Sequence, residues 1–181
     1  MTFTLVVAAC GTASSGNQNS VIGHGLGGTV FSSYPSSEDF YKLPSHLDSG
    51  SPGTLIRIQT ISNANGLMTL RVMYHSRDTF GHDAAVTGVI TYPTSAAPKG
   101  GWPVVAWDHG TSGMSQSCAP SRSSGPISTF GVRGVGVATD YLGMGPDGEI
   151  LPYLNRMTEA EATIDIVRAA RQIPDAHASA T

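Results

Sequence analysis

The chain has 181 residues, of which 40% are hydrophobic and 13% charged, and its formal net charge is −3. A chain of this length and composition folds as a globular domain with a sizeable core. The small negative charge leaves no basic footprint that would attract nucleic acid or anionic lipid, so nucleic-acid binding is not expected.

The first ten residues predict an exported protein. Phe3–Ala9 is a short apolar run that ends in Cys10, and it resembles the lipobox of bacterial lipoproteins, in which that cysteine is lipidated after cleavage. Residues 11–30, rich in Gly, Ser and Asn, then form a flexible tether. Met1-Thr2 lacks the positive charge that usually opens a signal segment. A buried strand ending in a core cysteine is the alternative.

We therefore expect an extracytoplasmic protein, either secreted or a cell-surface lipoprotein whose membrane contact is the lipid on Cys10. Lipidation of Cys10 would leave Cys118 alone in an oxidising compartment. A partner outside this chain, a buried free thiol and a Cys10–Cys118 disulfide remain open for Cys118.

No cofactor is expected. Gly23–Gly28 matches a dinucleotide fingerprint, but no strand precedes it and no helix follows it. The six histidines lack the spacing of metal ligands, so a catalytic metal is not expected either.

Residues 31–181 form the predicted folded domain, which opens with an irregular lead-in whose aromatic residues pack on the body. Alternating polar and apolar residues predict antiparallel strands over Leu55–Ile61, Leu67–Arg77 and Ala85–Tyr92, with a turn over Asn63–Gly66. The lead-in aromatics are Phe31, Tyr34, Phe40 and Tyr41.

The second half of the domain changes character. The apolar run Trp102–Trp107 predicts a strand in the sheet interior, covered on both faces, and Gly131–Tyr141 predicts a parallel strand. Thr158 to Glu161 fits a capping box, so a helix is expected over Thr158–Ile173, ended by Pro174. This succession predicts an α/β fold with antiparallel lead-in strands, then parallel strands with a covering helix.

The segment after Trp107 carries the candidate chemistry. An apolar strand that ends in His-Gly, followed by small residues with free N–H groups, can hold the developing alkoxide of an acyl transfer. The backbone amides of Gly110, Thr111 and Ser112 are the candidates, and Asp108 and His109 are expected to shape this loop.

Other polar residues are not expected to be catalytic. Ser115 lacks the second glycine of a nucleophile elbow and follows no strand. Asp140, Asp147 and Glu149 are expected in a solvated loop.

Several motifs from Phe40 to the end occur in a fixed order. They are Val72–Asp78, Val86–Pro93, Gly101–Val105 with His109–Thr111, Cys118–Ser121, Ala138–Gly145 and Ile173–His177. Together they resemble the secretory lipase family of α/β-hydrolases, of the fungal lipase A type. The resemblance implies a carboxylic ester hydrolase, a triacylglycerol lipase or esterase, that acts on an ester or lipid by Ser-His-Asp acyl transfer without a cofactor.

In that family a Gly-x-Ser-x-Gly elbow follows the segment that corresponds to Pro174–His177. This chain contains no such motif. We therefore expect the chain to be the N-terminal portion of an α/β-hydrolase, inactive as given, with nucleophile, acid and base beyond Thr181. The alternative is a non-catalytic surface lipoprotein or binding module derived from a lipase.

Overall fold

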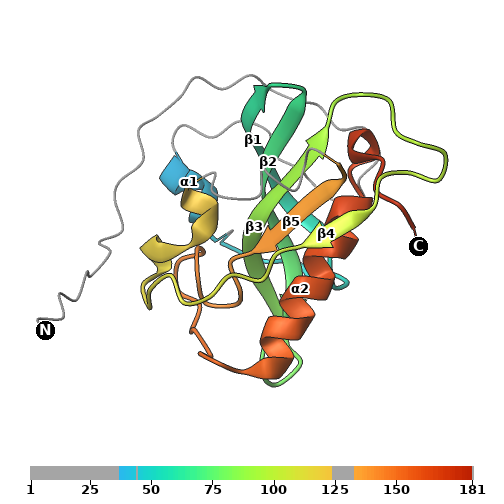
Figure 1. The fold of residues 1–181 in the computed structure, drawn as a ribbon. Helices are drawn as coiled ribbons and strands as arrows, with labels where there is room; N and C mark the ends of the chain where they lie inside the picture. Colours follow the sequence, from blue (N-terminus) through green and yellow to red (C-terminus); the bar gives the residue numbers. More distant parts are fainter. Residues whose placement is uncertain (1–36, 44, 124–132, 181) are drawn as a thin grey trace, which may run out of the picture.

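The computed structural model describes residues 37–43, 45–123 and 133–180 (Figure 1). The predicted signal segment 1–10, Cys10, the tether 11–30, Phe31 and Tyr34 lie outside these residues. The elements are α1 (Ser37–Tyr41), β1 (Leu55–Ala64), β2 (Leu67–Arg77), β3 (Asp83–Pro93), β4 (Val104–Ala106), β5 (Val135–Thr139) and α2 (Arg156–Arg171), with short 3₁₀ helices η1 (Gln116–Cys118), η2 (Pro120–Arg122) and η4 (Pro174–Ala176).

The described strands form one mixed five-stranded sheet in the order β1-β2-β3-β5-β4. β1, β2 and β3 pair as the predicted antiparallel meander. Asn65 and Gly66, with φ of 55° and 74°, make the tight turn between β1 and β2. β5 is antiparallel to β3 and parallel to β4. The sheet and its covering helix confirm the predicted α/β fold class.

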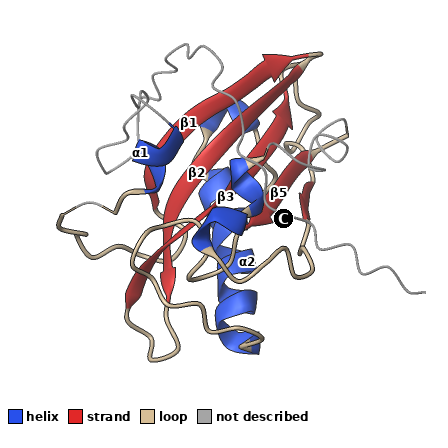
Figure 2. Cartoon of the chain, turned by 90° about the vertical axis from the view of Figure 1, so that its left-hand side faces the viewer, coloured by secondary structure: helices blue, strands red, loops and turns tan. Residues whose placement is uncertain are grey.

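α1 and α2 cover opposite faces of the sheet (Figure 2). Val72 and Tyr74 of β2 point to the main core, where they join Ile166 of α2. Met73, between them in sequence, points to the other face and packs with Phe40 and Tyr41 of the lead-in. The period of two along β2 thus separates the two apolar layers. The expected packing of Phe40 and Tyr41 on the body is confirmed.

The start of α2 differs from the prediction. The side chain of Asn155 caps the helix, accepting hydrogen bonds from the amides of Met157 at 3.0 Å and Thr158 at 3.3 Å. Thr158 therefore lies inside the first turn, and the expected capping box from Thr158 to Glu161 is wrong. Asn is among the strongest N-cap residues, and its position upstream lets the helix begin at Arg156.

β4 also differs from the prediction. It has only β5 as a strand partner among the described residues, so it lies at a sheet edge and not in the interior. Val105 is 40% exposed, and Ala106 is exposed as well. The apolar run around β4 therefore has an uncovered side.

The C-terminal segment meets this uncovered side. Trp102 forms an isolated parallel bridge with Ala178: the Trp102 amide donates to the His177 carbonyl at 2.7 Å, and the Ser179 amide donates to the Trp102 carbonyl at 2.8 Å. Toward β5, the Pro103 carbonyl accepts from the Val135 amide at 2.8 Å. Because successive residues of a strand direct their backbone groups to opposite sides, Ala178 lies on the side of Trp102 away from β5.

Candidate functional site

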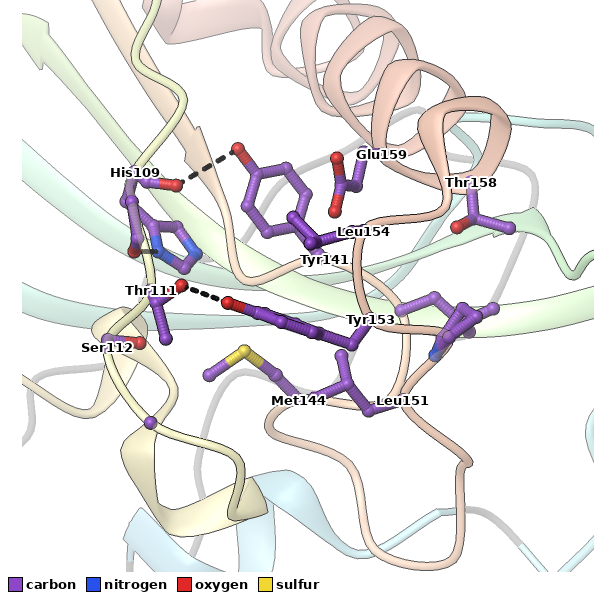
Figure 3. A pocket seen from close by; sticks show the side chains of 14 residues that line it. His109, Thr111, Ser112, Tyr141, Met144, Leu151, Tyr153, Leu154, Thr158 and Glu159 are labelled. Atoms are coloured by element: carbon purple, nitrogen blue, oxygen red, sulfur yellow. Dashed lines mark hydrogen bonds between the residues drawn. The ribbon is translucent and has the colours of Figure 1, made fainter.

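The loop that leaves β4 borders a cavity at the carboxyl ends of the parallel strands β4 and β5 (Figure 3). Ligands of open α/β sheets bind at this kind of edge. The cavity has a volume of about 170 Å³. Its lining residues are His109–Gly113, Tyr141, Leu142, Met144, Leu151–Leu154, Thr158 and Glu159.

The structure brings the three predicted loop residues to this one cavity. Gly110, Thr111 and Ser112 all line it. The backbone amides of Gly110 and Thr111 donate to no other residue that the structure describes. The Ser112 hydroxyl donates to the Cys118 carbonyl at 3.0 Å, which fixes the far end of the loop. The loop therefore offers unengaged N–H donors beside an apolar cavity.

His109 holds this loop through its ring and its backbone. Its imidazole is 9% exposed and packs between Trp107 and Tyr141, with ring centroids 6.0 Å and 4.7 Å away. Nδ1 lies 2.7 Å from the Gly110 carbonyl, which can only accept, so Nδ1 carries a proton. Nε2 is buried and has no partner among the described residues.

Two further contacts tie the loop to the domain. Asp108 accepts a hydrogen bond from the Thr163 hydroxyl of α2 at 2.8 Å. The Tyr141 hydroxyl donates to the His109 carbonyl at 3.4 Å. Burial, together with the nearby carboxylates of Asp108 and Glu159, raises the pKa of Tyr141 to about 12. Its hydroxyl therefore stays protonated, and remains a donor, at neutral pH.

Asp140 overturns the expectation of a solvated loop. It is 1% exposed, at the end of β5 directly before Tyr141. Its carboxylate accepts from the Thr87 hydroxyl at 2.5 Å, from the Ser121 amide at 2.8 Å and from the Ser121 hydroxyl. Burial raises the pKa of Asp140 and outweighs these hydrogen bonds, which lower it. Asp140 thus joins β3, η2 and the end of β5.

The other acidic residues of this loop are less buried. Asp147 is exposed, as expected, and Glu149 is half-buried. Burial raises the pKa of Glu149. Neither residue lines the cavity.

Ser115 lies outside the cavity lining. Its hydroxyl oxygen caps η1 by accepting from the Ser117 amide at 3.3 Å. Cys118, in the same short helix, is disulfide-bonded, which excludes the free-thiol alternative. The predicted lipidation of Cys10 stays a prediction.

Tyr153 is one of the cavity residues that the sequence did not indicate, together with Leu151, Pro152 and Leu154. Its hydroxyl lies 2.6 Å from the Thr111 hydroxyl, across the cavity mouth. Thr111 and Tyr153 are 42 residues apart in sequence, and no local pattern links them. The one sequence signal for Tyr153 is that a tyrosine, which is both polar and aromatic, stands shortly before the predicted helix.

The described ranges contain no group of three or more His, Cys, Asp or Glu residues placed to hold a metal ion. None of their helices has the length and apolar character needed to cross a bilayer.

The chain is similar to known proteins in structure. No protein-family model matches the sequence, and no curated protein matches it. The N228W mutant of the rice cell wall degrading esterase LipA from Xanthomonas oryzae matches with a TM-score of 0.55 and 25% identity, over 68% of this chain and 38% of LipA. Candida antarctica lipase A matches with a TM-score of 0.61 and 18% identity, over 78% of this chain and 37% of the lipase.

The chain therefore spans less than two-fifths of the length of these structures. Its mixed sheet and covering helix have the fold of the matching part of α/β-hydrolases of the lipase and esterase kind.

Proposed function

We propose that this chain supplies the oxyanion loop and a substrate cavity of a carboxylic ester hydrolase, a lipase or esterase that acts by Ser-His-Asp acyl transfer. The observation that carries the proposal is the parallel bridge from Trp102 to Ala178 on the open side of β4. A strand that continued from this bridge would run toward the loop that carries Gly110 and Thr111.

The direction of that strand follows from the ladder. Val104 and Ala106 alternate with Val105, so their backbone groups face the same open side as those of Trp102. A strand continued from Ala178 in this register would run beside Val104–Ala106, parallel to it. Its carboxyl end would then meet the cavity. A serine on the turn after such a strand would face the Gly110 and Thr111 amides.

The sequence holds no Gly-x-Ser-x-Gly, so we assign the nucleophile, acid and base to residues that follow Thr181 in a longer chain. The serine hydroxyl would attack the ester carbonyl and pass its proton to the histidine. The alkoxide formed would accept hydrogen bonds from the amides of Gly110, Thr111 and Ser112. Collapse expels the alcohol, which takes that proton, and water then releases the acid from the serine.

The fold neighbours support the ester chemistry and the place of action. LipA is described as a cell wall degrading esterase, and the Candida antarctica protein as a lipase. An ester or lipid is therefore the proposed substrate. We place this enzyme outside the cytoplasm, as a secreted or cell-surface protein, because LipA is described as degrading the rice cell wall.

The test begins with the coding sequence downstream of the Thr181 codon. We expect an open frame that encodes a strand and an elbow, and an extended protein that hydrolyses p-nitrophenyl esters. Ser→Ala in the elbow should abolish the activity. A stop codon at that point, with a cooperatively unfolding monomer that lacks esterase activity, would contradict the proposal and favour the surface lipoprotein or binding module.

The loop donors need a separate pair of variants of the extended protein. Gly110→Pro removes one N–H, and we expect kcat to fall about 10²- to 10³-fold with little change in KM. Gly110→Ala keeps the N–H, and its added Cβ would meet nothing within 4 Å, so it is the matched control. Equal kcat in the two variants would exclude the Gly110 amide from the oxyanion site.

A further inference from the structure

Tyr153 divides the cavity. In Figure 3 its ring lies between Tyr141 and Leu154 on one side and Met144 and Leu151 on the other. Its hydroxyl reaches across to the Thr111 hydroxyl, 2.6 Å away. Tyr153 is 46% exposed, so it forms part of the outer wall of the cavity.

A strained turn holds this wall in place. The Asn155 amide donates to the Pro152 carbonyl at 2.9 Å, which closes a turn with Tyr153 and Leu154 at its centre. Leu154 has φ of 60°, in the left-handed region that a leucine rarely adopts. Its side chain is 72% exposed, so burial of that side chain does little to offset the strain. Strain of this kind persists where the surrounding contacts fix it, and it gathers at ligand sites.

Two contacts fix the turn from either end. Asn155 caps α2 through its side chain, and Tyr153 bonds to the oxyanion loop. The turn is therefore held between the helix and the loop with the donors, and the Tyr153 ring has a defined place.

The remaining space is small and mostly apolar. Leu142, Met144 and Leu151 line it, and Figure 3 shows Met144 and Leu151 on the same side of the Tyr153 ring. A volume of about 170 Å³ is close to that of an engineered cavity of about 150 Å³ that binds benzene. The space therefore suits a group of about six carbon atoms.

We infer that Tyr153, bonded to Thr111, sets the length of the acyl group that this cavity accepts, and that esters of short acids of about six carbons are its substrate class. The inference rests on the proposed function, which places the ester carbonyl at the Gly110 and Thr111 amides. From there the acyl chain enters the space beside Met144 and ends against the Tyr153 ring.

The inference can be tested by binding, which needs no nucleophile. The 181-residue chain is labelled with ¹³C in the methionine methyl groups and titrated with methyl butanoate, hexanoate, octanoate and decanoate. The shift of the Met144 methyl gives a Kd for each ester. For the wild type we expect affinity to rise about fourfold per added methylene up to hexanoate and to rise no further beyond it.

Two variants of Tyr153 separate its ring from its hydrogen bond. In Tyr153→Ala the wall is gone, and we expect the rise in affinity to continue to octanoate or beyond. Tyr153→Phe keeps the ring and should keep the limit at hexanoate. Ile150→Ala is a control, because Ile150 is 84% exposed and does not line the cavity.

The outcomes distinguish this inference from the proposed function. An unchanged limit in Tyr153→Ala would overturn the inference alone, and so would a wild-type affinity that keeps rising to decanoate. The wild-type series tests the size limit even if a variant does not fold. If no ester of any length shifts the Met144 methyl signal, the cavity does not bind acyl groups. That result would contradict both the inference about Tyr153 and the assignment of this cavity to the substrate of the proposed hydrolase.

Discussion

The buried carboxylate of Asp140 predicts a particular dependence of stability on pH. Burial raises its pKa in the folded state, whereas in the unfolded chain it titrates near its ordinary value of about 3.9. The folded state therefore binds more protons than the unfolded state between these two pKa values. The contribution of Asp140 to stability is fully present below the unfolded pKa and is lost as pH rises through the folded pKa.

The size of this pH effect is set by the one proton that Asp140 binds in the folded state and not in the unfolded state. Between the two pKa values the free energy of unfolding should fall with pH by up to about 1.4 kcal/mol per pH unit because of Asp140. Asp140→Asn keeps the shape of the side chain but cannot ionise. Subtracting the variant from the wild type at each pH removes other titrating groups, including Glu149, and isolates Asp140.

The assay is urea unfolding of the 181-residue chain at several pH values from 3 to 8. We expect the stability of the wild type relative to Asp140→Asn to decrease as pH rises above about 4. Asp147→Asn, at an exposed acid of the same loop, should show no such decrease. A wild-type advantage that grows with pH would refute the reasoning, since it would mean that the hydrogen bonds from Thr87 and Ser121 outweigh burial.

Two predictions concern the backbone near the site. Asn155→Ala removes the α2 cap and should lower the free energy of unfolding by about 1 kcal/mol in urea, whereas Asn155→Asp should change it little; equal losses would show that the cap is not what matters. Gly145→Ala, with φ of 90° and a Cβ 2.1 Å from the Thr87 hydroxyl, should cost more than about 2 kcal/mol. Gly148→Ala, with φ of 87° and open space, should cost only about 1 kcal/mol, and an equal cost at both glycines would exclude the Thr87 clash.

Local patterns were enough to predict the meander. β1, β2 and β3 are half-buried or buried strands joined by short connections, and Asn65 and Gly66 fit the left-handed turn between the first two. The same kind of signal misplaced the start of α2, because Asn155 and Thr158 are both good N-cap residues. Thr158 instead directs its hydroxyl to the Asn155 carbonyl at 3.2 Å, inside the helix.

The candidate loop was predictable because its residues are consecutive. Gly110, Thr111 and Ser112 follow one strand and reach one cavity. Contacts between residues far apart in the sequence could not be found in this way. Tyr153 meets Thr111 across 42 residues, and Asp140 meets Thr87 across 53. Such contacts depend on how β3, β5 and the turn before α2 pack, which single-sequence periodicity does not encode.

Contrary to the prediction, β4 lies at an edge of the sheet, and this edge is open beside the candidate site. An apolar run such as Trp102–Trp107 is typical of a strand in a sheet interior that is covered on both faces. In the described structure β4 has β5 on one side, and on the other only the bridge between Trp102 and Ala178. Along that other side the backbone groups of Val104 and Ala106 have no strand partner among the described residues, which is the physical cost of an edge strand. A second parallel strand would remove this cost and, by the same register, bring its carboxyl end to Gly110 and Thr111. The apolar sequence of β4 and the position of the donors thus both favour the parallel strand that we propose beside β4.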